Sequence, residues 1–170
     1  MNPTYRDLGD HTETVQIDYD PTRISYRDLL DIFWQSHTPT SRSWSRQYAS
    51  IIFFHNEEQK RLAIETRDRE EARRDTKIHT EILPYSRFYL AEAYHQKYHL
   101  QQARELMKEF ILIYPDFLHV VHSTAAARVN GYLSGYGTRV SLERELGSLG
   151  LSPDAERTLI KHVLSSREGE

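Results

Sequence analysis

Three side chains with metal-ligating groups recur at helical spacing near the middle of the chain. Glu92 and His95 are three residues apart and His99 follows, so a continuous helix would place all three on one face. Glu-x-x-His motifs from two helices build di-iron sites, and two histidines one turn apart can hold zinc. The sequence has one such motif, and spacing alone does not make His11 a third ligand. We therefore expect no metal site here.

The 170 residues contain no cysteine. This composition excludes disulfide bonds, zinc–thiolate sites and thiol nucleophiles supplied by these residues. Gly131, Gly135 and Gly137 do not follow a predicted strand, so they do not form a phosphate-binding loop. A Gly-x-Ser-x-Gly nucleophile elbow is also missing from the sequence. We expect no cofactor.

Composition and charge narrow the classes of partner. Hydrophobic residues make up 38% of the chain and charged residues 28%, which is typical of a globular protein with its own core. The net charge of −3, with acidic and basic residues interleaved, gives no reason to expect nucleic acid as a partner. Apolar runs of membrane-spanning length and a signal-peptide core are both missing, so we expect no membrane partner and predict a cytoplasmic location.

Hydrophobic periodicity predicts alternating strands and helices before residue 100. Val15 and Ile17 alternate with polar residues, which indicates a strand, and Ser25 with Asp28 forms a capping-box pattern at a helix start. This order predicts an α+β sandwich in which helices pack on one mostly antiparallel sheet. The predicted elements are a strand over 13–19, a turn at 20–21, a helix over 25–34, a loop over 38–46, a buried strand over 48–54, a charged helix over 56–75, a strand over 77–82 and a helix over 88–99.

The pattern becomes entirely helical after Leu100. Apolar spacing predicts helices over 106–114, 123–132, 142–149 and 154–164, the last with Ser152 as its N-cap. We therefore divide the chain into a domain over 1–100 and a helical extension over 101–170.

Seven sequence blocks in the first 100 residues occur together in one known family. Their combination and order resemble the A-type peptide methionine sulfoxide reductases. The blocks are NPTY (2–5), the His-x-Glu of 11–13, ISYRDLLDIFW (24–34), His37 with Pro39-Thr40, RQYAS (46–50), KIHTEI (77–82) and FYLAEAYHQKY (88–98).

The resemblance implies a ferredoxin-like sandwich that lacks, in these residues, its first strand and helix and is followed by a helical C-terminal extension. It also implies a cysteine or selenocysteine nucleophile in a Gly-Cys-Phe-Trp motif upstream of Asn2. We therefore expect the true start of the protein to lie upstream of Met1, as when a selenocysteine codon is read as a stop.

The resemblance assigns roles to six residues. Sulfoxide reduction needs a soft nucleophile at sulfur and a proton for the departing oxygen, which a buried carboxylic acid and tyrosine hydroxyls can supply. By motif position, Glu13 is the acid and Tyr5 and Tyr48 are the hydroxyl donors. The family aspartate before the second tyrosine is replaced by Ser43, and both adjoining loops are shortened. His11, Glu92 and His95 are expected to support the pocket through hydrogen bonds.

Two classes of function follow. The first is reduction of methionine-S-sulfoxide, free or in peptides, with thioredoxin or another thiol as reductant. The second is a non-catalytic remnant or a module that binds oxidised methionine. Because the chain has no thiol of its own, we expect these 170 residues alone to be inactive.

Overall fold

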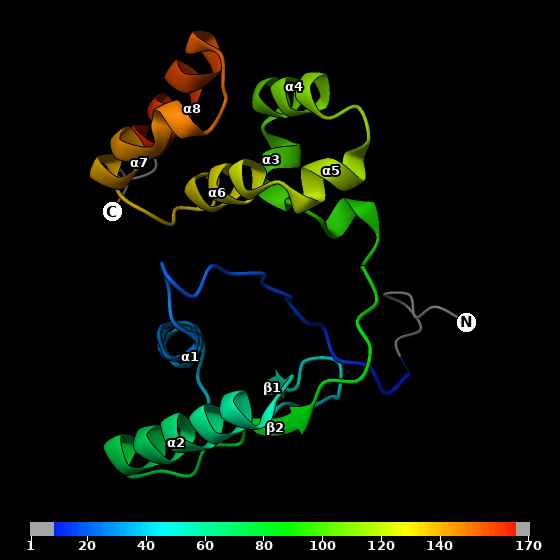
Figure 1. Cartoon of the computed structure of the whole chain (residues 1–170), viewed down its shortest axis with the longest axis vertical. Helices are drawn as coiled ribbons and strands as arrows, with labels where there is room; N and C mark the ends of the chain where they lie inside the picture. The colour runs from blue at the N-terminus through cyan, green and yellow to red at the C-terminus, as the bar shows by residue number, and fades with distance from the viewer. Residues whose placement is uncertain (1–8, 166–170) are drawn as a thin grey trace. The chain divides into compact units, whose positions relative to one another are not determined.

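The computed structural model describes residues 9–165, which fall into two compact units divided after Leu90 (Figure 1). The first unit combines helices with a small sheet, and the described part of the second unit is helical. The chain is therefore a mixed α/β protein, which confirms the predicted class at this coarse level. The predicted domain boundary at residue 100 stays a prediction, because this division into compact units does not test it.

A parallel pair of strands joined by a long helix organises the first unit (Figure 1). β1 (Ile51–Phe54) and β2 (Glu81–Pro84) form the sheet found in residues 9–165, and α2 (Glu57–Arg74) connects them. Parallel neighbours require such a crossover, whereas antiparallel ones can share a tight turn. The predicted strand–helix–strand order is confirmed, and the predicted antiparallel pairing is wrong for these two strands.

Helix α2 has matching signals at both ends. The Asn56 side chain accepts a hydrogen bond from the Gln59 amide, and Asp75 ends the helix in the left-handed conformation at φ 48°. Acidic residues occupy the first turn and Arg73 and Arg74 the last, which complements the helix dipole. The predicted capped helix over 56–75 is confirmed.

Helix α1 (Tyr26–Gln35) carries the apolar face of the first unit. Ser25 and Asp28 form the predicted capping box, in which each side chain bonds the backbone of the other. Leu30 and Trp34 are buried from this helix. They pack in one core cluster with Ile52, Ala63 and Ile78.

The predicted strand over 13–19 is wrong. This segment has no regular secondary structure, and Val15 and Ile17 are 82% and 58% exposed. Among the described residues, its one backbone hydrogen bond outside the following turn is from Glu13 to Gln47. A strand needs a full ladder with a neighbour, so alternating residues alone do not make one. The turn after it is confirmed, with the Thr22 amide bonded to Asp20 Oδ1 at 2.9 Å.

The second unit is a cluster of short helices around one apolar core. Helix α3 packs on α6, and α8 packs on both α4 and α6. The predicted helices at 106–114, 123–132 and 154–164 are confirmed. The elements are η1 (Ala93–His95), α3 (Tyr98–Gln102), α4 (Arg104–Ile113), α5 (Phe117–His122), α6 (Thr124–Leu133), α7 (Arg139–Glu145), η2 (Leu146–Ser148) and α8 (Pro153–Ser165).

The predicted helix over 88–99 is wrong. Residues 85–92 have no regular structure, and only a single 3-10 turn separates them from α3. Glu92 has an extended ψ of 151°, and Lys97 is left-handed at φ 48°. Each of these conformations interrupts a helix, so Glu92, His95 and His99 do not share one helical face. Within residues 9–165, every helix is too short or too polar to cross a lipid bilayer.

Candidate active site

Two motif segments far apart in sequence lie side by side in the first unit. The Glu13 amide donates to the Gln47 carbonyl at 3.0 Å, and the Thr12 hydroxyl donates to the Arg46 carbonyl at 3.0 Å. The Gln47 side-chain amide donates to Glu13 Oε1 at 2.7 Å. These three bonds place the predicted acid directly beside the segment that carries Tyr48.

The Glu13 carboxylate is exposed to solvent, so the predicted burial of this acid is wrong for the described residues. Its side chain accepts a hydrogen bond from the Gln47 side-chain amide. A donated N–H stabilises the ionised carboxylate, and water does the same.

Tyr48 lies in an aromatic pair with Trp44. The two ring centroids are 5.3 Å apart and the planes are inclined by 50°. Trp44 is 84% exposed and Tyr48 is 44% exposed. Trp44 was not among the site residues predicted from the sequence. The signal that could have identified it is a tryptophan within a Ser- and Arg-rich loop. Tyr5, the other predicted hydroxyl donor, lies outside the described residues.

The segment before β1 is anchored at both of its ends. Arg46 forms an ion pair with Glu81 at 2.6 Å, and the Glu81 amide donates to the Ser50 carbonyl at 3.0 Å. These contacts tie the Gln47–Tyr48 dipeptide to the start of β2. The position of Tyr48 is therefore fixed by the sheet and not by its loop alone.

A polar relay holds the end of α1 against both strands. His37 Nδ1 lies 2.8 Å from the Phe33 carbonyl, which can only accept, so this nitrogen carries the proton. In the neutral ring Nε2 then accepts from the Ser50 hydroxyl at 2.9 Å. Ser50 in turn lies 2.8 Å from the Thr80 hydroxyl, which donates to it. The relay joins the His37 and RQYAS blocks of the sequence pattern in space.

His11 contacts the segment just before the second unit. Its ring meets Tyr89 edge-on at 5.3 Å between centroids. Arg87 donates to the Tyr89 hydroxyl at 3.1 Å, and its guanidinium lies 5.8 Å from the ring centroid of Tyr89. The His-x-Glu block and the last block of the resemblance therefore meet in the first unit, through His11 and Tyr89.

Glu92 and His95 belong to the second unit, where His95 packs on Tyr94 at 4.1 Å between ring centroids. Their predicted role as pocket support stays a prediction. Residues 9–165 contain no cluster of three or more His, Asp or Glu residues placed to hold a metal ion.

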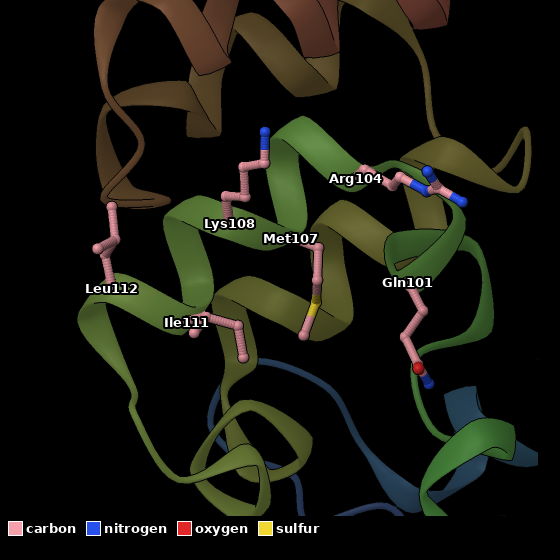
Figure 2. Close-up of a pocket in the computed structure, with 6 residues that line it drawn as sticks. All are labelled: Gln101, Arg104, Met107, Lys108, Ile111 and Leu112. Carbon is pink, nitrogen blue, oxygen red and sulfur yellow. The ribbon is translucent and has the colours of Figure 1, made fainter.

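A shallow pocket runs along α4 in the second unit and contains none of the predicted site residues (Figure 2). Met107 and Ile111 extend from the same side of the helix in Figure 2. The pocket lining also includes Gln101, Arg104, Lys108 and Leu112. Its mixed apolar and basic lining brings together no acid–base pair, so we do not assign it to catalysis.

Comparison with known proteins identifies the family. The family model for peptide methionine sulfoxide reductase matches residues 1–122. The peptide methionine sulfoxide reductase of Drosophila melanogaster is 44% identical over 174 residues, which cover 99% of this chain and 68% of that protein. The helical residues after 122 are thus included in this similarity.

Two further relatives match a smaller part of the chain. Peptide methionine sulfoxide reductase A1 of Arabidopsis thaliana is 42% identical over 57% of this chain and 52% of its own length. Peptide methionine sulfoxide reductase MsrA of Methanothermobacter thermautotrophicus is 45% identical over 57% of this chain and 64% of its own length. The chain thus spans between about half and two thirds of these relatives, and it belongs to the peptide methionine sulfoxide reductase family.

Proposed function

We propose that this chain supplies the proton-donating half of a peptide-methionine (S)-S-oxide reductase. The observation that carries the proposal is the pairing of two motif segments, one containing Glu13 and the other containing Gln47 and Tyr48. Three hydrogen bonds join these segments. The named relatives support the reaction class. Residues 1–100 are the proposed reductase domain and 101–170 its helical extension.

The proposed reaction has two stages. A thiolate or selenolate attacks the sulfoxide sulfur, and the sulfoxide oxygen receives a proton as it is transferred to the nucleophile, which leaves methionine and a sulfenic or selenenic acid. Two equivalents of thiol then restore the nucleophile and release a disulfide and water. Because these residues provide no resolving cysteine, an external thiol such as thioredoxin attacks the oxidised nucleophile directly.

Glu13 is the proposed proton donor, and Tyr48 with Tyr5 donates hydrogen bonds to the same oxygen. The Glu13 carboxylate is exposed here, so the proposed chemistry requires the substrate or a covering segment to exclude water from it. The apolar side chains of Val15 and Ile17, exposed on the same segment, offer a face for such a cover.

A second candidate is a module that binds oxidised methionine without reducing it. The composition favours it, because 170 residues without cysteine supply no thiolate. The binding residues would be the same Glu13, Gln47 and Tyr48.

The test compares three proteins with methionine-S-sulfoxide, methionine-R-sulfoxide, dithiothreitol and a metal chelator. They are the 170-residue chain, an extended protein with Gly-Cys-Phe-Trp before Asn2, and the same extension with serine replacing its cysteine. We expect turnover by the cysteine-extended protein alone, and only with the S diastereomer. Turnover by the 170-residue chain, or a folded but inactive extended protein, would contradict the proposal.

A further inference from the structure

Trp44 is exposed in a way that needs an explanation. Its side chain is 84% exposed, whereas Trp34, the other tryptophan of the chain, is 1% exposed in the core. Leaving an indole in water forgoes the large gain from its burial, and tryptophan is enriched at interfaces.

The backbone around Trp44 is held in place. The Ser43 hydroxyl donates to the Ser45 carbonyl at 2.7 Å and accepts from the Ser45 amide at 3.3 Å. On the other side, the Ala49 amide donates to the Arg46 carbonyl at 3.1 Å. The backbone that carries the indole is therefore a turn closed by hydrogen bonds. A ligand that binds the indole needs little further ordering of the chain.

The position of Trp44 relative to the candidate site suggests its ligand. Its ring packs on Tyr48, which directly follows Gln47, the residue bonded to Glu13. Trp44 is also the more exposed member of the pair. If the sulfoxide lies at Glu13 and Tyr48, the indole contacts what extends outward from it, namely the rest of a polypeptide.

We propose that Trp44 is a subsite for the residue that flanks methionine sulfoxide in a polypeptide, and that it favours an apolar or aromatic flanking side chain. This inference rests on the proposed function and deepens it, because it assigns a preference for the residue beside methionine sulfoxide in a peptide. A free amino acid has no flanking residue to place against the indole. Stacking of a flanking ring on Trp44 is worth about tenfold in affinity.

The kinetic test uses the extended, active protein with three substrates: free methionine-S-sulfoxide, a Gly-Met(O)-Gly peptide and a Phe-Met(O)-Phe peptide. We expect Trp44→Ala to lower kcat/KM for the Phe-flanked peptide about tenfold through KM, and to leave the other two unchanged. Tyr136→Ala, which removes an aromatic side chain 75% exposed in the second unit, is the matched control and should change none of them. An equal loss for all three substrates, or no loss at all, would overturn the inference.

A binding test separates this inference from the proposed reaction. The 170-residue chain is titrated with the Phe-flanked and Gly-flanked sulfoxide peptides while tryptophan fluorescence is followed. We expect the Phe-flanked peptide to change the emission at about tenfold lower concentration, and Trp44→Phe to abolish the change. An equal response to both peptides, or a response that survives in Trp44→Phe, would contradict the subsite even if the extended protein is an active reductase. If the extended protein is inactive but this titration succeeds, only the reaction is wrong.

Discussion

The side-chain amide of Gln47 donates a 2.7 Å hydrogen bond to the carboxylate of Glu13, across 34 residues of sequence. The same two residues are also joined through their backbones. The Gln47 side chain therefore orients the acid against the segment that precedes β1. The pairing joins Glu13 to the residue that precedes Tyr48 in the sequence, and the proposed chemistry requires both side chains to reach one sulfoxide oxygen.

Covering the 13–19 segment should stabilise the protein. Val15 and Ile17 are exposed in the described chain, so replacing both with Thr in the 170-residue protein should change its unfolding free energy little. In the extended protein we expect the same double substitution to cost about 2–4 kcal/mol, because the two side chains become buried. Urea unfolding of all four proteins measures the difference, and an equal effect in both backgrounds would refute the proposed cover.

The sequence predicted elements whose signals are local. Ser25 with Asp28, Asn56 and Ser152 each mark a helix start that the structure contains, because a side-chain oxygen bonded to a nearby amide acts over three residues. The predicted strand over 13–19 failed for the opposite reason. Pairing depends on a partner, and alternation of Val15 and Ile17 carries no information about one.

Motif order assigned the candidate site residues from the sequence but did not predict their environment. Motif order assigned Glu13 and Tyr48, and the structure brings their segments together. Exposure of Glu13 and the aromatic contact of Trp44 depend on tertiary arrangement, which sequence spacing does not encode. The helix predicted over 88–99 shows the same limit, since apolar spacing there is overruled by the conformations of Glu92 and Lys97.

Glu70 should make the stability of the first unit depend on pH. Its side chain is 8% exposed and bonds Arg73 at 2.6 Å and Arg74 at 3.2 Å, while Arg74 also donates to the Trp34 carbonyl. The hydrogen bond from Arg73 holds the pKa of Glu70 below its ordinary 4.5, although partial burial opposes this. A lowered pKa means that the stabilisation is present above the ordinary value and is lost as the pH falls through the folded-state value.

Replacing Glu70 with Gln should therefore cost about 1–2 kcal/mol at pH 7 and progressively less toward pH 3. Glu58→Gln, which removes an exposed partner of Arg61, is the matched control and should have little effect at pH 7. Urea unfolding across pH 3–7 measures both variants. If the loss of stability in Glu70→Gln grows as the pH falls, the predicted direction of the pH dependence is wrong.

The relay through Ser50 should fix the tautomer of His37. We expect nitrogen chemical shifts in NMR to show a protonated Nδ1 and an unprotonated Nε2, because Nδ1 faces the Phe33 carbonyl. Ser50→Ala removes the donor to Nε2 and the acceptor for Thr80, and should cost about 1–3 kcal/mol. Ser36→Ala removes an exposed hydroxyl bond and serves as control. A protonated Nε2 in neutral His37 would contradict the relay.

Gly137 should not tolerate a side chain. Its φ of +87° is unfavourable for other residues, and an added Cβ would lie 2.5 Å from Tyr132 Cε1. Gly137→Ala should destabilise the protein by about 1–3 kcal/mol. Gly147→Ala is the matched control in the second unit, because a Cβ there meets nothing within 4 Å. Thermal unfolding of the two variants tests this prediction. Equal unfolding midpoints would contradict the close approach of Gly137 to Tyr132.

The most direct test of the account is the turnover of Glu13→Gln in the extended, active protein. The amide keeps the shape of the side chain and an oxygen for the Gln47 bond but removes the proton, so we expect turnover of methionine-S-sulfoxide to fall about 10²–10⁴-fold with an unchanged unfolding midpoint. Asp18→Asn, which neutralises an exposed carboxylate on the same segment, should retain full activity. A Glu13→Gln protein with near-wild-type turnover would contradict the assignment of Glu13 as the proton donor.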